Sequence, residues 1–117
     1  MDTKLTTFDV DFTLWKAFQT KLIDNISVEE KKIRGSKAIS MLIADFLAGK
    51  IDVDVFTAEK PLENKYTAGL HIDEKVWLDL DIFLSKKKAE CLGDKEKQKY
   101  LNKGKVIIKL IRHYVNK

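Results

Sequence analysis

The chain carries the same short pattern twice, and this duplication constrains its fold more than any other feature. Residues 10–15 read VDFTLW, and sixty-two positions later residues 72–77 read IDEKVW. Each copy follows a short stretch of β-prone residues and precedes two helix-length segments with an apolar period. One strand–helix–helix unit alone leaves its strand edges unpaired and its apolar faces uncovered, so we expect the two copies to fold together.

Size and composition favour one compact, soluble domain. The 117 residues are 44% hydrophobic and 34% charged, with a net charge of +4 and a pI near 9.1. This charge alone only weakly favours a polyanionic partner. No apolar run approaches the roughly 18 residues of a membrane span, and no apolar signal core follows the N-terminus. With Cys91 as the only cysteine, no intrachain disulfide can form, and we expect a cytoplasmic protein.

The first unit is predicted from residue 4 to residue 49. Residues 4–10 alternate in polarity as a half-buried strand does, and Asp11 is a suitable helix N-cap. Residues 25–34 lose the apolar period and are expected to form a loop between two helices. The second helix begins near Gly35 and ends at Gly49. The two helical stripes are Leu14, Trp15, Phe18 and Leu22, followed by Ile39, Leu42, Ile43, Phe46 and Leu47.

The second unit repeats these features after a linker of residues 50–65. Residues 66–72 are predicted to form the second strand, and Asp73 repeats the N-cap. The alternating segment Ile51 to Phe56 could add a short edge strand within the linker. The offset of the last helix is sixty-eight, so six extra residues lie between the helices of this copy. Its stripes are Val76, Trp77, Leu80 and Leu84, followed by Ile107, Leu110, Ile111, Tyr114 and Val115.

This arrangement resembles the ribbon-helix-helix (Arc/MetJ/CopG-like) family of DNA-binding proteins, in which the unit is usually a separate chain and the ribbon forms across a dimer. The resemblance covers about residues 4–49 and 66–117 and rests on residue types more than on fixed letters. It implies a mostly α fold with a two-stranded antiparallel ribbon, built as a tandem pseudo-dimer in one chain. Residues 1–117 would then form a single domain, and a monomer would complete its own ribbon.

The resemblance also implies that the ribbon enters the major groove of DNA, which is wide enough for two strands. Parity gives the groove-facing residues as Leu5, Thr7, Asp9, Thr67, Gly69 and His71. The threonines can donate or accept at a base edge, Asp9 can accept from cytosine N4, and His71 can donate to a purine N7. Many relatives carry basic or amide residues here, whereas Asp9 would be repelled by phosphate. Because the two strands differ, we expect two different half-sites.

A second contact of the family is a phosphate clamp at the start of the second helix, where free backbone N–H groups and the helix dipole attract anions. The matching residues are Arg34, Gly35, Ser36 and Lys37 in the first copy and Asn102, Lys103, Gly104 and Lys105 in the second. A basic run from Lys86 to Lys105 is expected to extend the second clamp. Its eight lysines against three acids would make DNA binding depend steeply on salt.

The remaining chemistry-bearing residues predict no catalytic site. Trp15 and Trp77 lie on core stripes, so we expect them to pack in the core instead of stacking on bases. His113 is expected at the surface, and Cys91 is expected to be a spectator. The sequence has no Gly-rich phosphate loop, no Ser–His–Asp set and no metal-ligand spacing. We therefore expect no enzyme, no cofactor and no metal.

The sequence thus predicts a sequence-specific double-stranded DNA-binding protein, acting as a transcriptional repressor or as a plasmid transfer or partition (relaxosome accessory) factor. Further partners that fit the resemblance are a second copy on adjacent sites or a plasmid-processing protein, and no membrane partner is expected. The alternative is a protein-interaction module such as an antitoxin, with Ile51 to Phe56 as its docking strand.

Overall fold

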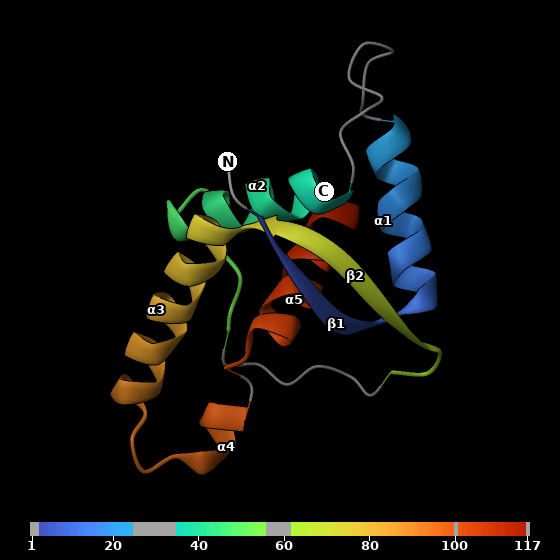
Figure 1. The fold of residues 1–117 in the computed structure, drawn as a ribbon. Coiled ribbons are helices and arrows are strands. Elements are labelled where there is room, and N and C mark those ends of the chain that lie inside the picture. Colours follow the sequence, from blue (N-terminus) through green and yellow to red (C-terminus); the bar gives the residue numbers. More distant parts are fainter. Residues whose placement is uncertain (1–2, 25–34, 56–61, 100, 117) are drawn as a thin grey trace.

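Two strands that are far apart in the sequence pair to form the ribbon. The computed structural model describes residues 3–24, 35–55, 62–99 and 101–116. β1 (Thr3–Asp11) lies antiparallel to β2 (Lys65–Asp73), as Figure 1 shows. Along both strands buried and exposed residues alternate in the same order. Thr7 faces Gly69 at the centre of the register, and these two residues are the sixty-two-offset equivalents of each other.

Five described helices accompany the ribbon. They are α1 (Phe12–Asp24), α2 (Gly35–Leu47), α3 (Glu74–Glu90), α4 (Lys95–Lys99) and α5 (Lys103–Val115). Each strand runs directly into a helix, and an aspartate caps both junctions, as the sequence predicts. The Asp11 Oδ1 accepts a hydrogen bond from the Thr13 N–H at 2.9 Å, and the Asp73 Oδ1 accepts from the N–H groups of Lys75 and Val76. A mostly helical fold with a two-stranded antiparallel sheet is therefore confirmed.

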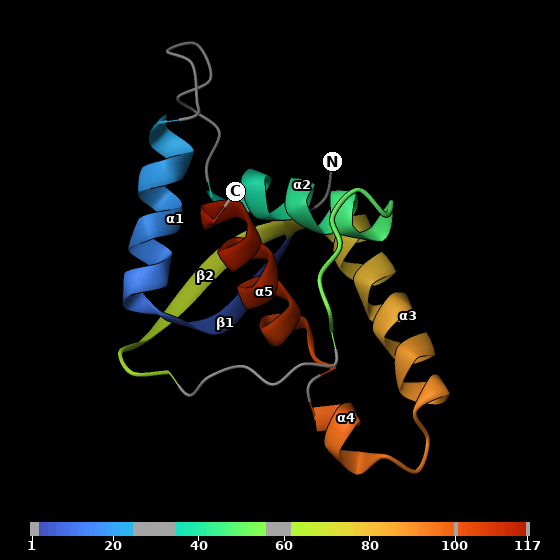
Figure 2. The same ribbon diagram turned by 180° about the vertical axis from the view of Figure 1, so that it is seen from behind.

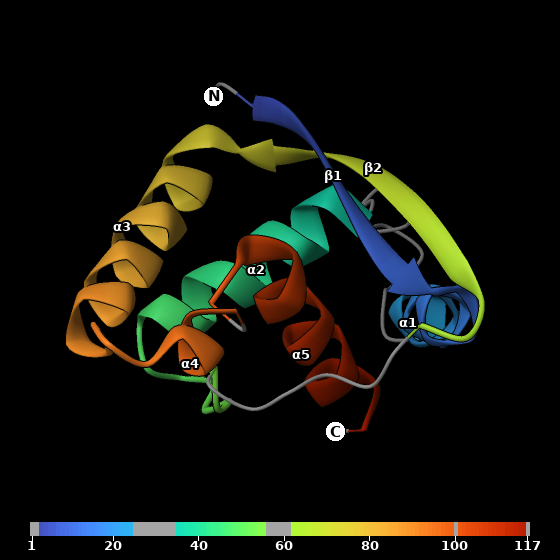
Figure 3. The same cartoon turned by 90° about the horizontal axis from the view of Figure 1, so that it is seen from below.

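The helices cover the inner face of the ribbon. In Figure 3, α2 and α5 lie beneath the two strands, while α1 and α3 stand at the two ends of the ribbon. The contacts cross between the units, because α1 packs against α5 and α2 packs against α3. Figure 2 shows the same arrangement from behind, with α5 lying across the ribbon. Neither half of the chain therefore has a complete core of its own.

The predicted stripes form the core. Both tryptophans are buried, as expected, and the buried apolar side chains of both units form one cluster. Burying one large apolar side chain contributes roughly 1.5–3 kcal/mol relative to leaving it exposed. The most deeply buried side chains are Val10, Phe18, Ile39, Ile43, Ile72, Leu80, Leu101, Val106, Ile107, Leu110 and Ile111.

The expectation of an edge strand at Ile51 to Phe56 is wrong for the described residues 51–55, which form no strand. Val55 is buried and Val53 is half-buried, so the alternating polarity of this segment reflects which side chains are buried and does not indicate a paired strand. This segment lies beside α2 and α3, whose backbone groups are already hydrogen-bonded within the helices, so it finds no strand partner. Instead, the buried Lys109 donates from its Nζ to the Asp54 carbonyl at 2.8 Å.

In the second unit the first helix is longer than in the first unit, and a short helix follows it. α3 has 17 residues where α1 has 13, and the short helix α4 follows it after a turn at Gly93, whose φ is +98°. This positive φ is a conformation that glycine adopts at little cost. α5 has 13 residues, as has α2, and both begin at equivalent positions. The insertion therefore leaves the second helix of the unit unchanged.

Candidate nucleic-acid interface

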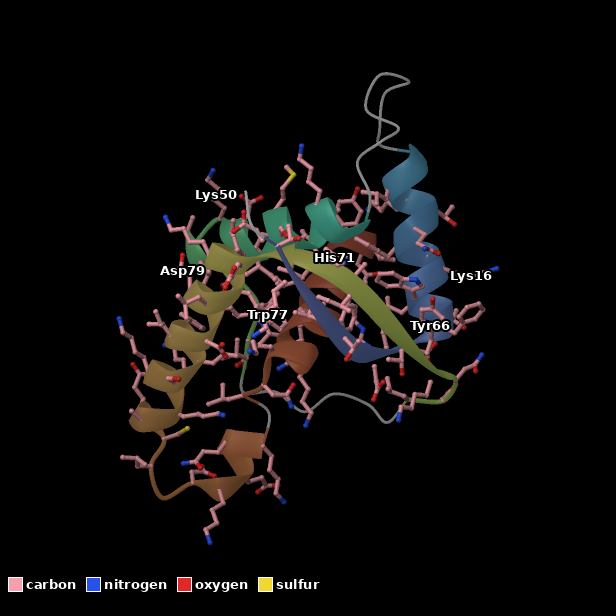
Figure 4. The ribbon with its side chains drawn as sticks, viewed as in Figure 1. Lys16, Lys50, Tyr66, His71, Trp77 and Asp79 are labelled. Atoms are coloured by element: carbon pink, nitrogen blue, oxygen red, sulfur yellow. The ribbon has the colours of Figure 1, made fainter. Side chains whose placement is uncertain are left out.

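All six residues predicted to face a groove lie on the exposed outer face of the ribbon, away from α2 and α5. The register sets them opposite each other in three cross-strand pairs, Leu5 with His71, Thr7 with Gly69, and Asp9 with Thr67. His71 is labelled on β2 in Figure 4, on the side of the ribbon that faces the viewer. The inner face is occupied by the buried Phe8, Val10, Ala68, Leu70 and Ile72.

One end of the outer face holds a hydrogen-bonded charge network. The Thr67 hydroxyl donates to the Asp9 carboxylate at 2.7 Å, and the Lys65 Nζ lies 3.3 Å from the other carboxylate oxygen. The Thr67 hydrogen bond, supported by Lys65, lowers the pKa of Asp9 below its ordinary value of 3.8 against a smaller opposing effect of desolvation. Asp9 is therefore ionised at neutral pH, and it can accept a hydrogen bond from a base amino group.

The centre and the other end of the outer face are different. At the centre, a Cβ added to Gly69 would meet only the Thr7 Cγ2, at 4.0 Å, so this part of the face is open. At the far end Leu5 is 61% exposed beside the exposed His71. An apolar side chain in this position can contact a thymine methyl group. The outer face thus presents an apolar and imidazole end, an open centre and an acidic, hydrogen-bonded end.

At the start of α5 the predicted clamp residues are close together. Several of their polar groups, however, already form hydrogen bonds or an ion pair with other residues of the chain. Asn102 is the N-cap, and its Oδ1 accepts from the Lys105 N–H at 2.8 Å. The Lys103 Nζ lies 2.8 Å from the Asp81 carboxylate and 4.5 Å from the centroid of the Trp77 ring. The Lys105 Nζ donates to the Lys99 carbonyl at 3.0 Å.

Gly104 connects this helix start to the ribbon. A Cβ at this position would lie 3.6 Å from the Phe8 Cβ and 3.5 Å from the Asn102 Oδ1. The first turn of α5 therefore lies against the inner face of β1, close to the strand that carries Thr7 and Asp9. A methyl group at this position would make only ordinary van der Waals contacts, so the packing of helix and ribbon does not itself require glycine.

At the start of α2, Gly35 and Ser36 form the first turn, and the Lys37 side chain is exposed. Arg34, which was predicted to belong to this clamp, lies outside the described residues. α2 is joined to the ribbon further along, where the Asp73 N–H donates to the Ser40 Oγ at 3.2 Å. Each second helix therefore has a described contact with the ribbon.

The basic run does not form one surface with the ribbon. α3 leaves the ribbon at Asp73, and Lys86 lies in its last turns, so a rise of about 1.5 Å per residue puts it about 20 Å from the ribbon end. In Figures 1 and 3, α4 lies on the side of the helices away from the ribbon. The run is therefore not one continuous surface: Lys86 lies far from the ribbon, whereas Lys99 lies beside the second clamp, where its carbonyl accepts from the Lys105 Nζ at 3.0 Å. Lys103 and Lys105 remain near the ribbon.

The sequence pattern missed the network of Asp9, Thr67 and Lys65. Parity gives the face of each residue but not the neighbour across the ribbon, which depends on the register. Centring the register on the equivalent residues Thr7 and Gly69 would have found it, because Asp9 then faces Thr67.

Comparison with models of known protein families, with curated proteins and with solved structures found no match. Within the described ranges, no three His, Cys, Asp or Glu side chains are grouped to hold a metal ion. None of the helices in those ranges has both the length and the apolar character that crossing a bilayer requires.

Proposed function

We propose that the protein binds double-stranded DNA in a sequence-specific manner, with the outer face of the ribbon in the major groove. The observation that carries this proposal is the register, which gathers Leu5, Thr7, Asp9 and their cross-strand partners on one exposed face of a two-stranded ribbon. A groove about 12 Å wide admits such a ribbon. The inner face is fully used by the core, so only the outer face is available to a ligand.

We also propose that the two units form a tandem pseudo-dimer, which corresponds to the two-chain dimer of the ribbon-helix-helix family that the sequence resembles. Three observations support this pseudo-dimer. Buried and exposed residues follow the same order in β1 and β2, α2 and α5 have equal lengths, and the ribbon register is centred on the equivalent residues Thr7 and Gly69. The six outer residues are not duplicated, however. The site read by the ribbon would therefore be asymmetric, with an amino-bearing base at the Asp9 end and a thymine methyl or purine N7 at the end of Leu5 and His71.

Phosphate contacts would come from the starts of the second helices, where the helix dipole favours anions. Lys37 is the best candidate, because its side chain is exposed at the first turn of α2. Lys103 and Lys105 already bind Asp81 and the Lys99 carbonyl, so they would contribute only by giving up these partners. The net charge of +4 is compatible with a polyanion, while the ionised Asp9 limits how closely phosphate approaches the ribbon.

The test is selection of bound duplex DNA from a random pool, followed by titration of the winning site and a shuffled control at two salt concentrations. Lys37→Ala should weaken binding to both sequences and lower the slope of log K against log salt by about 0.9. Thr7→Ala should weaken the selected site and leave the shuffled one unchanged. The proposal would be contradicted if the affinity were the same for the selected and shuffled sequences and neither substitution changed it.

The genomic position of the selected site would identify the biological role. A site at the protein's own promoter would indicate a repressor, and a site at a transfer origin or partition locus would indicate a plasmid transfer or partition factor. The protein-interaction alternative would need residues 51–55 to become a strand on pairing with a partner, because they form no strand in the chain alone.

A further inference from the structure

The outer side of α3 carries an apolar stripe that the core does not use. Leu78 is 56% exposed and Ile82 is 46% exposed, one helical turn apart. Ser85 and Ala89 continue the line at spacings of three and four residues and are also exposed. In Figure 4, Trp77 lies on the inner side of α3 and Asp79 on the outer side. We call Leu78, Ile82, Ser85 and Ala89 the α3 stripe.

The first unit shows that the fold does not require this stripe. The sixty-two-offset equivalents of Leu78 and Ile82 are Lys16 and Thr20, which are exposed on α1. The equivalent of Trp77 is Trp15, which is buried just as Trp77 is. The two helices therefore share their inner sides and differ on their outer sides. Alternating spacings of three and four residues are those of a helix that packs against another helix.

Apart from the exposed Lys75 and Glu90, the charges beside the stripe are acidic at its beginning and basic at its end. Glu74 and Asp79 flank its beginning, and Lys86 and Lys88 flank its end. None of these four side chains makes an ion pair with another residue in the described parts of the chain. The helix dipole favours the same polarity, so the charges alone would not indicate a partner. Together with two exposed apolar residues, they define a surface that is complementary to itself.

We propose that the α3 stripe is a self-association surface, on which α3 of a second copy packs antiparallel about a two-fold axis near Ile82. This arrangement sets Asp79 of each copy beside Lys86 of the other and Glu74 beside Lys88, so every charge pair occurs twice. A parallel arrangement would set like charges together. Leu78 and Ile82 of both copies then fill the seam between the helices.

The contact is small, and it leaves the ribbon free. α3 is about 25 Å long, and a pair of single helices falls below the roughly 1,200 Å² typical of stable interfaces, so the association is weak and reversible. Because α3 stands at one end of the ribbon, its outer side and the outer face of the ribbon are separate surfaces. The surface and its test are independent of the proposed binding of DNA.

The first experiment measures the mass of the full-length chain by sedimentation equilibrium, without DNA, at concentrations up to about 1 mM. A dimer whose dissociation constant exceeds about 1 mM would count as no association. The wild type should pass from monomer to dimer. The double variant Leu78→Lys/Ile82→Thr, which carries the residues of the first unit, should dimerise at least about tenfold more weakly. The matched control Lys16→Ala/Thr20→Ala should behave as the wild type. A wild type that remains monomeric throughout would overturn the proposal.

The second experiment tests the antiparallel pairing. Asp79→Lys and Lys86→Asp should each prevent dimerisation, because each sets like charges opposite one another. A mixture of these two variants should form a heterodimer, because every pair is then opposite in sign again. Circular dichroism spectra identical to that of the wild type establish that both variants are folded. Two variants that each dimerise, or a mixture that does not, would contradict the antiparallel arrangement.

Discussion

The two halves of the molecule bury equivalent residues and expose different ones. Trp15 and Trp77 are 6% and 7% exposed, and Val10 and Ile72 are both fully buried. On the surface, by contrast, Lys16 corresponds to Leu78, and Thr7 corresponds to Gly69. Core positions are restricted by close packing with the other half, whereas surface positions are free to differ. The buried equivalences thus explain the shared fold, and the exposed differences are where function can reside.

The largest expected effect tests the equivalence of the two cores. Trp15→Ala and Trp77→Ala should each lower the free energy of unfolding by about 3–5 kcal/mol, because each removes a large buried side chain from one shared cluster. The measurement is urea denaturation followed by circular dichroism. If one substitution costs several kcal/mol and the other almost nothing, the two halves do not contribute equally to the core.

A smaller effect should separate the two helix caps. Asp73 accepts two backbone hydrogen bonds, and Asp11 accepts one. Both alanine substitutions should destabilise the fold by roughly 0.5–2 kcal/mol, with Asp73→Ala the more costly. Thermal unfolding of the two alanine variants measures these losses of stability. The Asn substitutions at the same positions serve as controls, because they retain a capping oxygen. A more costly Asp11→Ala would show that the described hydrogen bonds do not determine the order.

Gly69→Thr makes the two strands identical at the centre of the ribbon. The added Cβ has room, and the β propensity of threonine should leave stability unchanged or raise it by up to about 1 kcal/mol. If the ribbon reads DNA, the preference at the central base pairs should change while affinity for shuffled DNA does not. Marked destabilisation in urea would mean that the centre of the ribbon is less open than described.

The smallest effect concerns the charge network at one end of the ribbon. The folded-state pKa of Asp9 lies below its ordinary value of 3.8, so the network stabilises the fold above that pH, and this contribution is lost as the pH falls through the folded pKa. Thr67→Ala should raise the pKa of Asp9 towards its ordinary value, and Thr67→Ser should preserve it. Carboxyl-carbon NMR titration measures both, and an unchanged pKa in Thr67→Ala would exclude the hydroxyl as the main cause.

Much of the fold could be predicted because the sequence presents its pattern twice. The predicted strands 4–10 and 66–72 differ by one residue at each end from Thr3–Asp11 and Lys65–Asp73. Parity also gave the outer face of the ribbon, because side chains alternate strictly along a strand. Both predictions rest on local geometry within each strand, and the repetition of the pattern indicated that the two strands belong together.

What could not be predicted depends on contacts between distant segments. The alternation at residues 51–55 indicates buried side chains, but it cannot show whether a strand lies alongside. Lys103 fits a clamp by its place in the helix, yet it binds Asp81 and the Trp77 ring because α3 packs beside α5. The candidate site was therefore predicted better on the ribbon than at the helix starts.

The ribbon register has a consequence for how the chain folds. Paired residues are between 54 and 70 positions apart, so every rung of the ladder closes a long loop. Such non-local pairing slows folding relative to a helical bundle of similar size. Because α1 also needs α5 for its packing, a nascent chain cannot stabilise its first half until almost all of the sequence has been synthesised.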